Sequence, residues 1–218
     1  MSLLHHHDHG CHGEACAAEA ADSPAYRRVL WVALVLNAAM FFVEMAGGLR
    51  AGSVSLLADS VDFFGDAANY GVSLFVLGMA AIARARAALL KGLSMAAFGV
   101  FVIARALWNL NAGTVPEPVT MGSIGFLAML VNVGVAVMLY AWREGDANMR
   151  SVWLCSRNDA ISNVAVMLAA LGVFGTGSSW PDLLVASVMA VLALTSARHV
   201  IAGARREMRD AMATVPVR

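Results

Sequence analysis

Six long apolar stretches constrain the fold of this chain more than any other feature of its sequence. Each has about 20 residues or more, the length that an α-helix needs to cross roughly 30 Å of hydrocarbon at 1.5 Å per residue. The sequence therefore predicts an all-α polytopic membrane protein with six transmembrane helices. The stretches are residues 29–49, 54–80, 88–110, 119–142, 152–175 and 183–203. The predicted turns between them are residues 47–53, 83–87, 111–118, 143–150 and 175–182.

The composition supports a membrane environment. Of the 218 residues, 60% are hydrophobic and 14% are charged, whereas a soluble domain has about 45–50% apolar and about 25% charged residues. We therefore expect membrane lipid as a partner. Because the net charge is zero, we expect no nucleic acid as a partner. The three cysteines are too few and too unevenly spaced for the disulfide framework of a secreted domain.

The basic residues predict the orientation. If the spans alternate, twelve lysines and arginines fall on one side of the membrane and only Arg50 falls on the other. Because positive loops stay in the cytoplasm, we expect both termini to be cytoplasmic, in the inner (plasma) membrane of a bacterium. The first 26 residues lack the positive start and apolar middle of a secretory signal. The twelve are Arg27, Arg28, Arg84, Arg86, Lys91, Arg143, Arg150, Arg198, Arg205, Arg206, Arg209 and Arg218.

Three aspartates interrupt the second apolar stretch. Asp62 and Asp66 are four residues apart, so they project from one face of a helix, and Asp59 lies one turn earlier. A charged side chain in the hydrocarbon costs about 2.5–3.5 kcal/mol on insertion scales and is by default a functional candidate. Two ionised carboxylates one turn apart also repel, unless a cation or a shared proton lies between them.

The fifth stretch repeats this spacing with Cys155 and Asp159. Thiolate and carboxylate both enter tetrahedral zinc-like sites. Two pairs on two facing helices would form a four-coordinate cage, so the predicted metal ligands are Asp62, Asp66, Cys155 and Asp159. The alternatives are a structural polar pair on the second helix and a small packing cysteine on the fifth.

Two segments resemble the cation diffusion facilitator family of divalent metal/proton antiporters. The first is NAAMFFVEMAGGLRAGSVSLLADSVDFFGDAANYGVSL (37–74), and the second is CSRNDAISNVAVMLAALGV (155–173). The resemblance implies that the four predicted ligands bind the transported ion midway across the membrane and that the chain forms a homodimer. Zinc-selective members often have histidine at the positions of Asp62 and Cys155, and most members have a C-terminal cytoplasmic domain, which we expect to be missing here.

Two further acids are secondary candidates for the site or for a proton path. These are Glu44 in the first stretch and Asp59, for which capping or solvation at the end of its helix is an equal alternative. The intramembrane asparagines Asn37, Asn69, Asn132 and Asn163 are expected to join helices by hydrogen bonds rather than to bind ions.

The N-terminal segment has a metal-binding composition. We expect residues 1–26 to be a flexible cytoplasmic tail that captures metal, residues 27–206 to be the transmembrane cation efflux domain, and residues 207–218 to be a short cytoplasmic tail. The candidate tail ligands are His5, His6, His7, His9, Cys11, His12 and Cys16.

The expected function is secondary active export of divalent transition-metal cations in exchange for protons, with zinc first and cadmium and cobalt next, as in metal resistance. The metal is a substrate, and no cofactor is expected. One alternative is a membrane metal-sensing or storage subunit that uses the tail. Another is a membrane-embedded metal-dependent enzyme, but the sequence has no H-E-x-x-H or G-x-S-x-G motif, so we expect no enzyme. An organic-cation exporter would need an aromatic cage that the sequence does not suggest.

Overall fold

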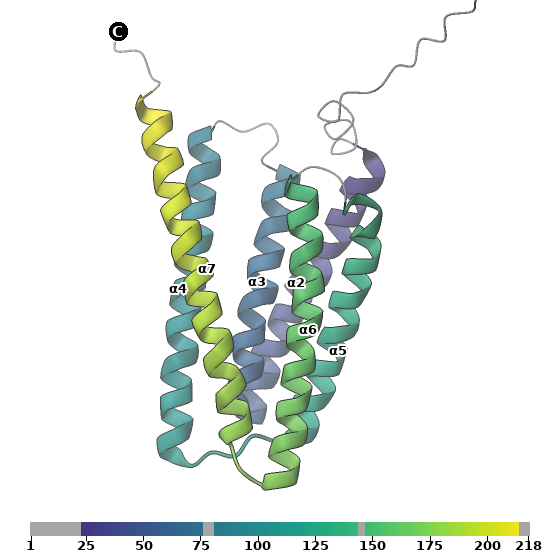
Figure 1. The fold of residues 1–218 in the computed structure, drawn as a ribbon, viewed down its shortest axis with the longest axis vertical. Coiled ribbons are helices and arrows are strands. Elements are labelled where there is room, and N and C mark those ends of the chain that lie inside the picture. The colour runs from purple at the N-terminus through teal and green to yellow at the C-terminus, as the bar shows by residue number, and fades with distance from the viewer. Residues whose placement is uncertain (1–22, 76–80, 144–146, 214–218) are drawn as a thin grey trace, which may run out of the picture.

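The computed structural model describes residues 23–75, 81–143 and 147–213. Within these ranges the chain is helical and contains no strand, and its long helices run side by side along one axis (Figure 1). The first turn of α2 and the last turn of α7 lie at the same end of the bundle. The helices are α2 (Pro24–Ala51), α3 (Val54–Phe75), α4 (Ala81–Ala112), α5 (Pro118–Leu139), the short 3₁₀ helix η1 (Tyr140–Trp142), α6 (Ala147–Thr176) and α7 (Trp180–Ala213).

Five segments of the described chain are long and apolar enough to cross a membrane. They are Pro24–Ala51, Ala85–Ala112, Pro118–Trp142, Ser156–Thr176 and Trp180–Ala211. The helix outside this set is α3, which has 22 residues and carries three aspartates. The all-helical prediction is therefore confirmed. The second predicted span differs from the other five because it carries Asp59, Asp62 and Asp66.

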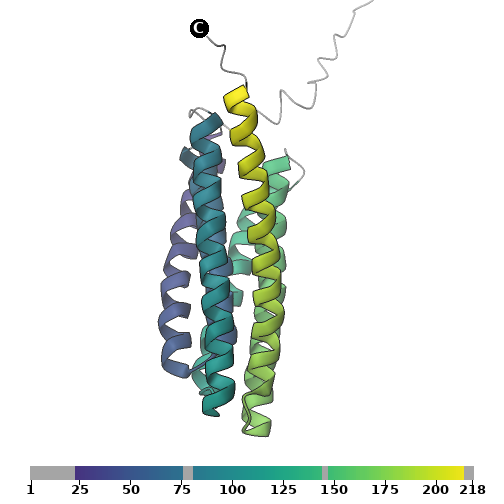
Figure 2. The same cartoon turned by 90° about the vertical axis from the view of Figure 1, so that its left-hand side faces the viewer.

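The helix α3 occupies the centre of the bundle. It contacts each of the other long helices, and the most extensive contacts elsewhere are between α4 and α7 and between α5 and α6. Figure 2 shows α4 and α7 running next to each other along one side. Most of the circumference of α3 is therefore covered by other helices, so most polar side chains on α3 face a neighbouring helix.

Several predicted turns are shorter than the sequence indicated. Residues 83–87 were expected to form a connection, but they lie inside α4. Alanine and arginine are both strong helix formers, so a charged run built from them does not end a helix. Likewise α2 continues through Ala51, α6 begins at Ala147, and residues 207–213 continue α7.

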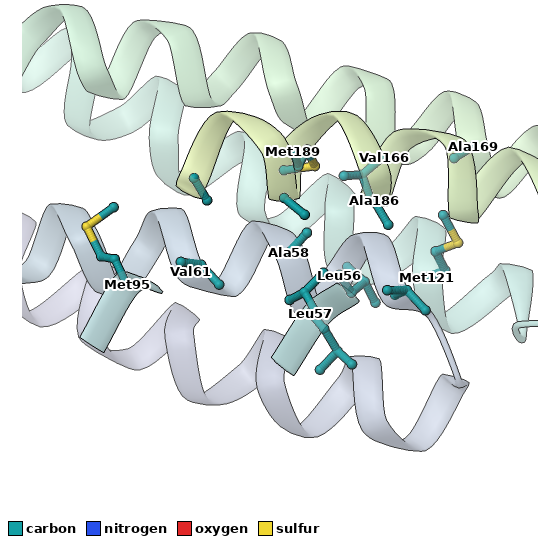
Figure 3. Close-up of a cluster of buried hydrophobic side chains, with 14 of the residues drawn as sticks. Leu56, Leu57, Ala58, Val61, Met95, Met121, Val166, Ala169, Ala186 and Met189 are labelled. Carbon is teal, nitrogen blue, oxygen red and sulfur yellow. The ribbon is translucent and has the colours of Figure 1, made fainter. Parts of the chain in front are cut away.

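The outer surface and the interior are both apolar. Large side chains such as Phe42, Val137 and Phe174 are 68%, 69% and 74% exposed on the bundle surface, where lipid would cover them. Inside, the main core cluster joins α3 to its neighbours through side chains such as Leu57 and Met189 (Figure 3). Hydrophobicity on both sides is what a membrane-spanning bundle requires.

The turn between α2 and α3 depends on two glycines. Gly52 ends α2 with a φ of 69°, a left-handed conformation that favours glycine. At Gly48, an added Cβ would lie 2.9 Å from Leu57 Cδ2 and 3.1 Å from the Leu57 backbone nitrogen. The two helices therefore approach closely because Gly48 has no side chain.

The first turn of α3 is held by an acid from a distant part of the chain. Asp182 of α7 is fully buried and accepts hydrogen bonds from the hydroxyls of Ser53 (2.7 Å) and Ser55 (2.6 Å). It also accepts from the backbone N–H groups of Val54 (2.8 Å) and Ser55 (3.0 Å). Because the first N–H groups of a helix have no partner within the helix, Asp182 serves as an interhelical cap.

Two other helices begin with caps of their own. Ser23 accepts from the backbone N–H of Tyr26 at the start of α2. Glu117 accepts from the N–H groups of Val119 and Thr120 at the start of α5. The hydrogen bonds from Thr120, and then that from Val119, lower the pKa of the exposed Glu117 carboxyl. Both caps are followed by a proline, which is favoured at the first helical position.

Candidate functional site

The predicted acid-bearing faces of α3 and α6 meet inside the bundle. Asp66 of α3 is 6% exposed and hydrogen-bonds with the carboxyl group of Asp159 of α6, which is half-buried. A hydrogen bond between two carboxyl groups requires a proton on one of them, because ionised carboxylates only accept. The structure thus brings Asp66 and Asp159 together, in an arrangement that either a proton or a cation can occupy.

A second link between these helices lies next to the first. The Tyr70 hydroxyl of α3 donates to Asp66 Oδ2 at 3.2 Å and lies 2.7 Å from Ser156 Oγ of α6. Tyr70 and Ser156 are both buried. Neither residue was predicted as a site residue from the sequence. Tyr70 follows Asp66 by four residues, so its helical face could have indicated its position.

Asp62 belongs to the same electrostatic neighbourhood. It is half-buried, and its carboxyl interacts electrostatically with those of Asp59 and Asp66. Asp159 interacts electrostatically with Asp62 as well. Three acids on two helices consequently share one region, and their mutual repulsion favours any cation that enters it.

The fourth predicted ligand cannot be placed in the same detail. Cys155 lies in α6 one turn before Asp159, and its side chain is outside the described set. Among the described side chains, no group of three or more histidines, cysteines, aspartates or glutamates is gathered closely enough to hold a metal ion. The roles of Asp62, Asp66, Cys155 and Asp159 as metal ligands therefore stay a prediction.

A basic residue lies at the edge of this region. Lys91 of α4 donates a hydrogen bond to Asn69 Oδ1 of α3, and its charge acts on Asp66. From the sequence, Lys91 was predicted only as one of the cytoplasmic basic residues. In the structure it lies in α4, where it supplies a positive charge to the region of the acids.

The remaining acids form a separate buried network. Glu44 of α2 and Asp59 of α3 are both fully buried, and their carboxyl groups interact with each other. Asn163 of α6 donates from its amide nitrogen to Asp59 Oδ2, and Asn132 of α5 donates to Asn163 Oδ1 at 3.1 Å. Asp59 therefore neither caps its helix nor lies at the surface, and that alternative is wrong. For Asn132 and Asn163, the expected role in joining helices is confirmed.

The candidate tail ligands lie outside the described residues. The predicted capture segment from His5 to Cys16 thus remains a sequence-based hypothesis.

A bundle of apolar helices with carboxylates buried between them is the architecture of an integral membrane protein with a buried polar site. Residues 30–208 match the family model described as the cation efflux transmembrane domain. The chain therefore belongs to the cation efflux family, the cation diffusion facilitators that its helix motifs resemble.

Relatives of this chain include named metal transporters. It is 24% identical over 190 residues to the cadmium, cobalt and zinc/H(+)-K(+) antiporter of Bacillus velezensis, covering 80% of this chain and 60% of the relative. It is 22% identical over 204 residues to the metal cation efflux system protein CzcD of Cupriavidus metallidurans, covering 88% and 59%. It is 23% identical over 200 residues to the zinc transporter ZitB of Escherichia coli, covering 84% and 63%. The chain thus spans about three fifths of the length of these relatives.

Proposed function

We propose that this protein exports divalent transition-metal cations from the cytoplasm in exchange for protons. Zinc is the first candidate substrate, and cadmium and cobalt come next, in agreement with the names of the relatives. In this proposal all six long helices, including α3, span the membrane. Both termini are cytoplasmic, and the protein acts as a homodimer.

The observation that carries this proposal is the carboxyl pair of Asp66 and Asp159. The two acids lie on helices far apart in sequence and meet inside the bundle. The carboxyl group of Asp62 interacts electrostatically with the carboxyl group of Asp159. Buried acids without a compensating charge are costly. A divalent cation that replaces the shared proton compensates the negative charge of the buried acids. The same site can therefore hold either a proton or a metal ion.

The proposed transport cycle follows from this exchange. Asp62, Asp66, Cys155 and Asp159 must lose their protons before they bind metal, so metal loading from the cytoplasm releases protons. After the helices rearrange to open the site to the other side, protons compete for the same groups and release the metal. Tyr70 and Ser156 hold α3 and α6 together beside the acids, so both helices would have to move in concert.

Transport by reconstituted protein tests this function. Proteoliposomes with an imposed pH gradient should accumulate zinc with the wild-type protein. The variants Asp66→Asn and Asp159→Asn should lose zinc binding by more than the roughly 10–100-fold that a change outside the ligand shell typically costs. Binding of zinc to the purified protein, measured by an element-specific method, separates loss of affinity from loss of movement.

The matched control is Glu207→Gln, which makes the same acid-to-amide change on an exposed residue of α7. It should transport and bind like the wild type. If both aspartate variants also transport like the wild type, the assignment of the metal site is wrong.

The composition of the N-terminal tail favours one other function, a metal-sensing or storage subunit. Deletion of residues 1–22 distinguishes the two functions, because an exporter should keep most of its transport and a sensor that depends on the tail should lose its metal response. A metal-dependent enzyme is not favoured by any described feature.

A further inference from the structure

The buried pair of Glu44 and Asp59 is not used by the proposed metal site. Neither carboxyl oxygen of Glu44 is paired with an N–H or hydroxyl donor, and Asp59 Oδ1 has no such donor either. Asp59 Oδ2 already accepts from the Asn163 amide. The group that acts most directly on Glu44 is the Asp59 carboxyl, and two carboxyl groups can hydrogen-bond only when one of them holds a proton.

The surroundings of the pair fix its orientation. Asn132 donates to Asn163 Oδ1, so the amide of Asn163 is turned with its nitrogen toward Asp59. All four residues are at most 1% exposed, and each comes from a different helix. Unpaired carboxyl oxygens in such a buried network are costly, so a proton held between Glu44 and Asp59 would lower the cost of burying them.

The pair is displaced from the metal site along the bundle axis. Asp59 precedes Asp66 by seven residues on α3, which is about 10 Å of helix rise, and Asn163 follows Asp159 by four residues, which is about 6 Å. Both displacements lead toward the turn between α2 and α3, at the end opposite the first turn of α2 (Figure 1). In the proposed orientation this is the external half of the protein.

We infer that Glu44 and Asp59 form a second station, which binds the counter-transported proton on its way from the external side to the metal site. This inference rests on the proposed export function and adds a place for the proton that is distinct from the metal ligands. A proton entering from outside meets this carboxyl pair before it reaches Asp66 and Asp159.

The charges around the pair explain how it is coupled to the metal. The groups that act on Glu44 are the acids Asp59 and Asp62, and Asp59 also acts on Asp159. From α5 the network includes the neutral Asn132, which contacts Asn163, whereas the charge of Lys91 on α4 acts on Asp66. A proton on the pair removes negative charge near Asp62 and Asp159, so it weakens their hold on a divalent cation.

Infrared spectroscopy of the reconstituted full-length protein tests the station without any transport. A protonated carboxylic acid has a carbonyl stretching band that an ionised one lacks. The wild-type protein should show such a band from the pair, and Glu44→Gln and Asp59→Asn should each remove it. Asp159→Asn and Glu207→Gln should each leave the band of the pair in place. Because the Asp66–Asp159 pair can contribute a band of its own, the readout is the difference between wild type and variant, and the inference is overturned if neither Glu44→Gln nor Asp59→Asn loses carbonyl intensity relative to the wild type.

Proton and metal fluxes test the coupling. In proteoliposomes with a pH-sensitive dye inside, Glu44→Gln should reduce metal-driven proton flux by roughly 100-fold, the lower end of what a positioned proton-transfer group contributes. Its equilibrium binding of cadmium should stay well above that of Asp159→Asn, which also shows that the variant is folded. Wild-type proton flux in this variant overturns the inference, as does a loss of cadmium binding equal to that of Asp159→Asn. If the wild type itself moves no metal, the export function fails, while the infrared result still decides whether the pair holds a proton.

Discussion

Among the four proposed ligands, Cys155 is the one that we expect to influence metal preference most. Thiolate is a softer ligand than imidazole and favours ions such as cadmium. We expect Cys155→His to shift the ratio of cadmium to zinc binding toward zinc, and Cys155→Ser to weaken cadmium binding more than zinc binding. Competition between the two metals on purified protein measures both ratios.

The position of Cys155 one turn before Asp159 makes the result decisive for the ligand set. An unchanged ratio in both variants would mean that the sulfur does not touch the metal. The paired control is Asp159→Asn, which should weaken both metals because a carboxylate is a ligand for either.

The acids show how far single residues could be predicted. The spacing of Asp62, Asp66 and Asp159 was enough to expect facing carboxylates, because burial of acids in apolar sequence is costly and spacing by four fixes the face. The pairing of Glu44 with Asp59 was not predictable, since it depends on how α2 is rotated against α3. The same is true of Lys91, whose contact with Asn69 depends on the packing of α4.

Asp182 acts at the level of whole elements, because it joins the first turn of α7 to the first turn of α3. Asp182→Ala would leave two backbone N–H groups and two hydroxyls without their acceptor. We expect it to reduce the free energy of unfolding by about 1.5–3 kcal/mol, the range for a hydrogen bond to a charged group. Thermal unfolding in detergent measures the loss.

A double-mutant cycle separates the cap from other roles of Asp182. Once Asp182 is alanine, the further change Ser55→Ala should cost less than it does in the wild type, because the two side chains share one interaction. Additive losses would show that the cap contributes nothing to stability.

Gly48 controls the approach of two elements, α2 and α3. Gly48→Ala should destabilise the protein by about 1–3 kcal/mol, because the new methyl group would overlap with Leu57. The matched control is Gly134→Ala in the interior of α5, where an added Cβ meets nothing within 4 Å. This control should be neutral or stabilising by up to about 1 kcal/mol, so equal losses in both variants would contradict the close-packing explanation.

Helices were easier to predict than their ends. The length of an apolar stretch is set by the bilayer, so each predicted span corresponds to a long helix. The ends were misjudged where a polar run consists of helix formers, as at residues 83–87. The cap on α3 could not be predicted, because Asp182 lies 127–129 residues away in sequence from the groups it binds.

At the scale of the whole molecule, the order of packing was not predictable from the sequence. The helices are apolar on the sides that face lipid and on the sides that face each other, so hydrophobicity does not reveal which helices are neighbours. The structure places α3 in contact with all the other long helices. This central position gives the acids of α3 their partners on α2 and α6.

The orientation of the whole bundle remains to be tested, and its basic residues predict it. Arg205, Arg206 and Arg209 lie on the last turns of α7, at the same end as the first turn of α2 (Figure 1). The opposite end includes Val115, which is 48% exposed between α4 and α5. Because cytoplasmic segments are enriched in positive charge, we expect Val115 to face the exterior and Arg209 to face the cytoplasm. In a variant with its three cysteines replaced by serine, Val115→Cys should react in intact cells with a membrane-impermeant maleimide, and Arg209→Cys should react only after the cells are opened. The reverse labelling pattern would invert the proposed direction of transport. It would also put Glu44 and Asp59 on the cytoplasmic side of the metal site, where a proton from outside would reach the metal site before it reached them.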